Sequence, residues 1–122
     1  MKSKWDDERK FLKKHVLEME RVVDLLGQRE LQLRDAAVLY ALEAYCSWRS
    51  GRIRVTAKKL AERLSMQEKH VISSLTRLKK LQLLGKVMDR HTGEWFYLFN
   101  PSLVTVGTTQ TQKGLWNAWG EA

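Results

Sequence analysis

The chain has 122 residues, of which 43% are hydrophobic and 30% are charged, and it contains one proline and one cysteine. This length and composition predict one folded, helix-rich domain and exclude a disordered chain. The formal net charge is +8, no apolar run is long enough to cross a membrane, and a lone cysteine excludes an internal disulfide.

The first expected element is a long amphipathic helix over residues 3–26. Apolar residues recur there at alternating spacings of four and three, the pattern of one helix face. This stripe consists of Leu12, Val16, Met19, Val23 and Leu26. The helix is either a core helix or the seam of a coiled-coil-like dimer. The dimer is favoured, because a partner would bury both the seam and its apolar flanks.

A second helix is expected over residues 34–50, and a short strand follows around Ile53 and Val55. Thr56 is the predicted N-cap of the next helix, because a threonine hydroxyl can accept a hydrogen bond from an amide of the first turn. That helix ends at a tight break over residues 65–67.

The helix predicted after this break covers residues 67–82. Helical spacing turns Val71, Leu75 and Leu78 toward the core. The opposite face carries polar and basic side chains, so it is available for binding.

Two short strands, over residues 85–90 and 94–99, are expected to form a hairpin. Gly93 can adopt the positive φ that a three-residue hairpin loop requires. Both faces of the second strand are apolar, so we expect it to be covered on both sides. The segment 101–122 begins as a polar tail and is predicted to be helical over residues 113–119.

The order of these elements predicts a winged helix-turn-helix, mainly α with a small β-hairpin wing. In this fold one helix fits the major groove of B-DNA and the preceding helix braces it across the backbone. We expect a single domain over residues 1–122, with three parts. They are an N-terminal dimerisation helix over 3–26, a winged helix-turn-helix core over 34–99 and a C-terminal extension over 101–122 with a short helix.

The basic residues are concentrated in the predicted winged helix. Twelve of the 22 Lys and Arg residues lie between Arg49 and Arg90, with only three acids, Glu62, Glu68 and Asp89. Clustered positive charge on a small fold is typical of a protein that binds a polyanion, most commonly nucleic acid. The sequence therefore predicts double-stranded DNA as the partner.

Two segments resemble known families. The segment VLYALEAY…VTAKKLAERLSMQEKHVISSLTRLKKLQLLGKV is similar to the winged helix of bacterial MarR-type regulators, over residues 33–99. The segment GEWFYLFNPSLVTVG…KGLWNAW resembles RepL-type plasmid and phage replication proteins, which have similar winged helices.

The MarR-type resemblance implies which residues of the helix over 67–82 face the groove. They are Gln67, Lys69, His70, Ser73, Ser74 and Arg77. Ile72 departs from the pattern, since a polar residue is often found at its position. Ile72 either touches a thymine methyl group or is buried by a rotated helix.

The resemblance implies two further sets of DNA contacts. Arg90, His91 and Thr92 would contact DNA from the tip of the wing. Thr56 and Lys58, at the start of the bracing helix, would meet phosphate, where helix amides add positive potential.

The cysteine and the tryptophans each have two interpretations. Cys46 is predicted to be a buried core thiol, with a redox-sensor role, as in some MarR-type regulators, as the alternative. Trp48, Trp95, Trp116 and Trp119 lie on apolar stripes, so we expect them in the core rather than stacked on unpaired bases.

No pattern in the sequence indicates an enzyme. The three histidines, His15, His70 and His91, lack metal-ligand spacing, and one cysteine makes no thiolate cluster. The seven glycines form no phosphate-binding loop. We therefore predict a protein without catalytic activity, cofactor or metal.

These features predict a homodimer that binds specific double-stranded DNA and acts as a bacterial or phage transcription regulator in the cytoplasm, with no signal peptide. A RepL-like initiator that binds a replication origin is one alternative. Others are a winged-helix protein-interaction module that leaves its DNA face unused, and a binder of single strands or RNA. MarR-type regulators hold effector ligands between their dimer and DNA-binding regions, but no residue marks such a pocket.

Overall fold

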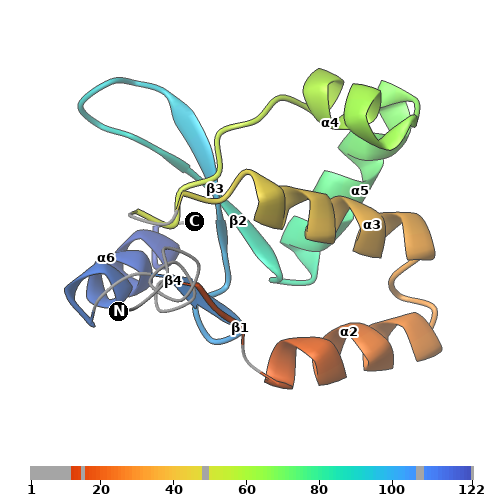
Figure 1. Ribbon diagram of the computed structural model, residues 1–122, viewed down its shortest axis with the longest axis horizontal. Coiled ribbons are helices and arrows are strands. Elements are labelled where there is room, and N and C mark those ends of the chain that lie inside the picture. Colours follow the sequence, from red (N-terminus) through yellow and green to blue (C-terminus); the bar gives the residue numbers. More distant parts are fainter. Residues whose placement is uncertain (1–11, 15, 48–49, 107–108, 122) are drawn as a thin grey trace, which may run out of the picture.

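The chain forms a winged helix-turn-helix with an extra helix at each end (Figure 1). A computed structural model describes residues 12–14, 16–47, 50–106 and 109–121. For residues 12–14, 16–17, 105–106 and 109–111 the description covers the backbone alone. The predicted fold class, mainly α with a small hairpin, is confirmed.

The N-terminal segment differs from the predicted continuous helix over 3–26. Residues Leu12–Lys14 form strand β1, and helix α2 begins only at Val16 and runs to Gly27. Strand β1 pairs antiparallel with β4, Val104–Val106. The prediction was wrong here because pairing with a distant strand overrides local helical periodicity. Residues 3–11 and 15 of the predicted helix lie outside the described residues.

The predicted dimer seam changes accordingly. Leu12 lies in the strand rather than on a helix, so a continuous helical seam from Leu12 to Leu26 is wrong. The side chain of Val16 lies outside the described ones. Met19 and Val23 are exposed, at 57% and 64%, whereas Leu26 packs partly against the core.

Three helices form the central bundle. They are α3 (Leu33–Ala44), α4 (Ala57–Leu64) and α5 (Glu68–Lys80). Helix α3 ends earlier than the predicted 34–50, because Cys46 already forms an extended bridge to Ile53. Figure 1 shows α2 alongside α3, and α4 at the top of the view.

The wing is the antiparallel hairpin of β2 (Leu84–Met88) and β3 (Trp95–Phe99). Gly93 has a φ of 73° in the connecting loop, as predicted. The predicted short strand is present as Ile53 alone, which is fully buried and bridges both Cys46 and Tyr97. This bridge fastens the base of the wing to the helical bundle.

The two apolar faces of β3 are covered by different parts of the molecule. Phe99 belongs to the main core, with residues from the helices. Phe96 and Leu98 form a second cluster with Val87 and with Leu115 of α6 (Thr109–Trp119). The prediction of a strand covered on both sides is therefore confirmed only in part, because the face of Phe99 also carries Trp95, which is exposed.

The expectation that the tryptophans lie in the core is only partly right. Trp119 packs partly against the second cluster. Trp95 and Trp116 are 57% and 50% exposed, so the core prediction is wrong for both. Trp48 lies outside the described residues. Among the residues described, no helix has both the length and the apolar character needed to cross a membrane.

Candidate nucleic-acid interface

Helix α5 presents one polar, solvent-exposed face. Lys69, Ile72, Ser73 and Thr76 are exposed on it, at the spacings of three and four that place residues on one helix side. The buried side carries Val71, Leu75 and Leu78, as predicted. Ile72 is exposed at 49%, so the alternative of a helix rotated to bury it is excluded.

Ser74 does not lie on the exposed face, and its expected position was wrong. Its side chain is fully buried, and its hydroxyl donates to Asp35 Oδ1 of α3 at 2.6 Å. Ser74 lies three residues after Val71 and four before Leu78, so helical spacing alone places it on the buried side. The polar residue type was misleading, because a buried hydroxyl is acceptable when it has a partner.

Asp35 is the partner that sequence reasoning missed. Its carboxylate is fully buried and accepts hydrogen bonds from three groups: the Gln32 backbone amide at 2.8 Å, the Ser74 hydroxyl, and Arg77 Nη1 at 2.7 Å. The signal in the sequence was an acid three residues after a polar residue at a helix start, the spacing of a capping box. Asp35 thus caps α3 and attaches α5 to it.

Arg77 and His70 lie on the flank of α5 that faces α3. Arg77 pairs with the buried Asp35, so it is a structural residue as well as a basic one. Arg34 Nη1 lies 3.1 Å from His70 Nδ1. Because a guanidinium can only donate, His70 Nδ1 is the acceptor in this contact. Both predicted groove residues are thus partly engaged within the protein.

The wing tip has the predicted residues on its surface. Arg90, His91 and Thr92 are exposed in the hairpin loop. The loop is shaped by Asp89, whose Oδ1 accepts from the His91 amide at 2.8 Å and the Thr92 amide at 3.4 Å. Arg90 is 3.4 Å from Glu121, an exposed ion pair that leaves its guanidinium accessible.

Arginines also hold the base of the wing. Arg52 pairs with Asp89 at 2.6 Å and stacks over the Phe96 ring, 4.4 Å from its centroid. Arg54 lies 3.6 Å from Asp89 and 3.4 Å from Glu94. The amide of His91 and then Arg52 keep the pKa of Asp89 below its usual 3.8. These contacts join the extended segment after α3 to the hairpin.

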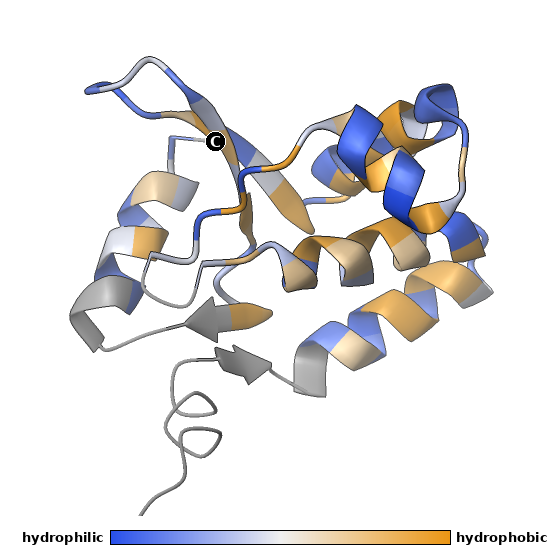
Figure 2. Cartoon of the chain, turned by 45° about the horizontal axis from the view of Figure 1, so that its top comes forward, coloured by the Kyte–Doolittle hydropathy of each residue, from blue (hydrophilic) through white to orange (hydrophobic). Residues whose placement is uncertain are grey.

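The basic residues between Arg49 and Arg90 divide largely by residue type, with Arg63, which is exposed and lies over the Tyr45 ring, as an exception. Four of its arginines are paired with carboxylates: Arg52, Arg54, Arg77 and Arg90. Five exposed lysines of α4 and α5 have no carboxylate partner within the described part of the chain: Lys58, Lys59, Lys69, Lys79 and Lys80. Figure 2 shows hydrophilic residues on α4 and at the hairpin tip. Lysines thus supply most of the accessible charge.

The start of α4 has the predicted capping geometry. Thr56 is its N-cap, and its Oγ1 accepts from the Lys59 amide at 3.1 Å. The surface beside Thr56 continues to the wing. A groove of about 470 Å³ is lined there by Arg54, Val55, Thr56, Lys59, Glu94 and Trp95. The aromatic wall of this groove was missed because Trp95 was assigned to the core.

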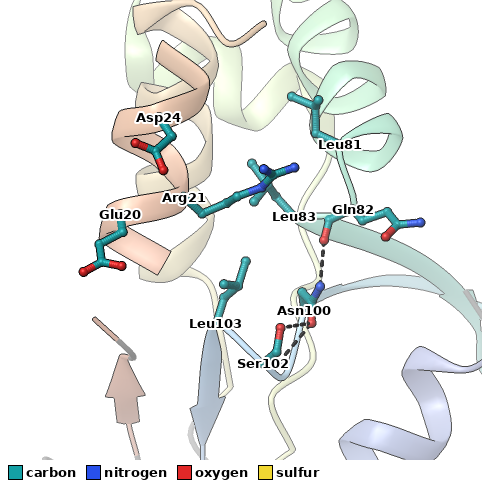
Figure 3. Close-up of a pocket in the computed structure, with 9 residues that line it drawn as sticks. All are labelled: Glu20, Arg21, Asp24, Leu81, Gln82, Leu83, Asn100, Ser102 and Leu103. Atoms are coloured by element: carbon teal, nitrogen blue, oxygen red, sulfur yellow. Dashed lines mark hydrogen bonds between the residues drawn. The ribbon is translucent and has the colours of Figure 1, made fainter. Parts of the chain in front are cut away.

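A second groove lies between α2 and the ends of α5 and β3 (Figure 3). It measures about 360 Å³ and includes Arg21 from α2. Asn100 Nδ2 donates to the Gln82 carbonyl at 2.9 Å, and Asn100 Oδ1 accepts from the amide and hydroxyl of Ser102. Gln82 has a φ of 60°, so Asn100 stabilises a strained turn. These bonds give Asn100 a structural role.

Cys46 has the properties of an unreactive thiol. It is half-buried against the main core. Burial, with a smaller effect from Glu43, raises its pKa to about 11, so at neutral pH the side chain is a thiol and not the nucleophilic thiolate. Within the described ranges, no group of three or more His, Cys, Asp or Glu side chains could hold a metal ion.

Comparison with known proteins finds matches among solved structures alone. No family model and no curated protein matches the chain. Solved structures do match: MepR of S. aureus in complex with DNA (16% identity, TM-score 0.44, 85% of this chain) and a MepR mutant (16%, 0.47, 84%). PcaV of Streptomyces coelicolor, a transcriptional regulator, matches at 18% identity with a TM-score of 0.41 over 85% of the chain.

These likenesses concern the fold alone. MepR and PcaV are winged-helix regulators of the MarR family, the family that residues 33–99 resemble. The chain spans 64% of the length of the MepR chains and 70% of PcaV. The resemblance of the C-terminal segment to RepL-type proteins stays a prediction.

Arg77→Ala should destabilise the protein, although the sequence places Arg77 among the groove-facing residues. Removing Arg77 leaves the buried Asp35 carboxylate with fewer donors. We expect the free energy of unfolding to fall by about 2 kcal/mol, measured by urea denaturation. Lys79→Ala, which removes an exposed basic residue of the same helix, is the control and should change stability by less than about 0.5 kcal/mol. Equal stability of both variants would contradict the structural role.

Stability should also depend on the protonation of Asp35. Burial raises the pKa of this carboxyl, but hydrogen bonds from Ser74, the Gln32 amide and Arg77 outweigh it and hold the pKa below 3.8. A group with a lowered folded-state pKa stabilises the protein above its unfolded pKa, and this contribution is lost as the pH falls through the folded value. Ser74→Ala removes one of the hydrogen bonds that lower the folded-state pKa of Asp35, so we expect a smaller acid-induced loss of stability than in the wild type, as measured by urea midpoints between pH 2 and 6. If stability depended on pH in the same way in Ser74→Ala and the wild type, the hydrogen bond from Ser74 would not lower the pKa of Asp35.

Proposed function

We propose that the chain is a transcription regulator that binds specific double-stranded DNA as a homodimer. The observation that carries this proposal is the exposed face of α5, which bears Lys69, together with the exposed lysines of α4, which packs against α5, and the exposed tip of the wing. An α-helix fits the major groove of B-DNA, and positive residues on either side of it neutralise the phosphates that border the groove.

The elements would divide the work on DNA. Helix α5 would enter the major groove with Gln67, Lys69 and Ser73 near base edges. The N-terminus of α4, with Thr56 as cap and Lys58 beside it, would meet a phosphate. Phosphate contacts fix the position of the protein, whereas base contacts specify the sequence.

The wing would contact the adjacent backbone or minor groove. Arg90, His91 and Thr92 lie at its exposed tip. Lys86 lies 5.5 Å from the ring centroid of Trp95, which directs both side chains to one face of the hairpin. Because Arg52 and Arg54 fasten the wing to the bundle, its tip would approach DNA in a defined position.

The homodimer is supported by the outer face of α2. Met19 and Val23 are exposed there, one helical turn apart, while Val22 and Leu25 of the same helix are buried in the core. A second copy would remove these apolar side chains from water. Two α5 helices in successive major grooves about 34–36 Å apart would then require an inverted-repeat site.

DNA binding should be tested by selecting sequences from random duplexes with the full chain. We expect a palindrome, whereas directly repeated sites would favour the replication initiator. On the selected duplex, Lys58→Ala should weaken binding and reduce the slope of log K against log salt by about 0.9, the value for one phosphate contact. Fluorescence anisotropy between 50 and 300 mM salt measures this slope.

Lys113→Ala is the matched control, because Lys113 is an exposed lysine of α6 beyond the hairpin. It should retain wild-type affinity and salt dependence. Absence of binding to any duplex at about 50 mM salt would refute the proposal and favour a protein-interaction module. If single strands outcompeted duplex DNA for the protein, a binder of single strands or RNA would be favoured.

The dimer is tested by Met19→Asp combined with Val23→Asp. Both side chains are exposed in the isolated chain, so the double variant should still fold, with the wild-type circular dichroism spectrum, and lose dimerisation through desolvated, repelling charges. Sedimentation velocity measures the mass, and Met88→Asp on the exposed face of the wing is the control that should stay dimeric. A dimer that persists in the double variant would place the interface elsewhere.

A further inference from the structure

Ile72 is an apolar side chain at the centre of a polar surface. Within α5, all of which is described, it is the one large hydrophobic residue with an exposed side chain, at 49%. Its exposed neighbours on the same face are Lys69, Ser73 and Thr76. Isoleucine contributes nothing to the core in this position, and a polar residue there would cost less free energy in water.

The hydroxyl groups beside Ile72 are already engaged. Ser73 Oγ donates to the Lys69 carbonyl at 3.0 Å, and Thr76 Oγ1 donates to the Ile72 carbonyl at 3.0 Å. Their single protons are used within the helix, although their oxygens can still accept. The middle of the exposed face is therefore less able to donate to base edges than its sequence suggests, and its methyl groups are the accessible part.

The size of this apolar feature argues against a protein partner. Protein docking surfaces are contiguous apolar patches of several hundred Å², but Ile72 is surrounded by Lys69, Ser73 and Thr76 and is followed along the helix by Lys79 and Lys80. A single aliphatic side chain bordered by cations fits a partner that is mainly anionic and offers one small apolar group at a time. The major groove of DNA has this character, because each thymine exposes one C5 methyl group there.

We propose that Ile72 recognises a thymine methyl group and so specifies a T·A pair at one position of each half-site. The inference rests on the proposed function and adds a specificity-determining residue to it. Ile72 is the fifth residue of α5, in the N-terminal half of the helix, the part that approaches base edges in helix-turn-helix proteins. Lys69, one turn earlier, would hold the helix against the neighbouring phosphate or guanine.

The test replaces single thymines by deoxyuridine in the selected duplex, which removes the C5 methyl group and keeps the base pair. Wild-type protein should lose about fourfold in affinity at one thymine per half-site, corresponding to about 0.8 kcal/mol for one buried methyl-sized group. Ile72→Ala should bind the thymine duplex about fourfold or more weakly and show no further loss with uracil. This non-additivity identifies the contacting pair.

Two variants serve as controls. Ser73→Ala should keep the full uracil penalty, because its hydroxyl is bonded within the helix. Ile72→Val should retain part of the penalty, since it keeps branched methyl groups. Alanine is also the better helix former at an exposed position, so circular dichroism and the melting temperature of Ile72→Ala should match the wild type.

The outcomes separate this inference from the function on which it rests. A selected palindrome at which uracil has equal effects on wild type and Ile72→Ala at every position would overturn the Ile72 contact and leave the regulator intact. Failure to select any duplex would overturn both. The loss of affinity with uracil could also persist in Ile72→Ala and disappear in Ser73→Ala. That result would assign the methyl contact to Ser73 and would likewise overturn the proposal.

Discussion

The binding surface depends on one buried carboxylate. Asp35 lies fully buried between α3 and α5 and accepts from the Gln32 amide, the Ser74 hydroxyl and Arg77. An ionised carboxylate without partners would be very costly in this position, so the three donors must stay in place. Because two of them are on α5, they fix its rotation about its own axis. That rotation decides that Ile72 faces solvent and Ser74 does not.

A division between arginine and lysine follows from this architecture. Arginine presents a planar fork that matches carboxylates, whereas lysine is a flexible and strongly hydrated point charge. The chain uses Arg77 to hold α5 and Arg52 to hold the wing. The lysines of α4 and α5 remain exposed. The concentration of charge in residues 49–90 therefore has two causes, internal fastening and an outward positive surface, and only the second bears on a polyanion.

The sequence predicts the fold better than the site, for physical reasons. Helical spacing identifies α5 and its core residues, and Gly93 identifies the hairpin loop. Position on a helix follows from local periodicity, but the partner of a polar side chain depends on a residue far along the chain. Ser74 and Arg77 meet Asp35 from 39 and 42 residues away. Strand β1 was missed for the same reason, because the strand with which it pairs lies far along the chain, at residues 104–106.

The short N-terminal helix has a mechanical consequence for a dimer. Helix α2 is attached to the bundle through Val22 and Leu25, and β1 immediately before it is paired with β4, beyond the wing. A second copy bound to Met19 and Val23 would thus be connected to α5 through a close-packed core, which transmits displacement rather than absorbing it. The separation of the two α5 helices would then be set by packing on α2. The spacing of the two half-sites on DNA would therefore depend on the packing of the core as well as on the dimer contacts of Met19 and Val23.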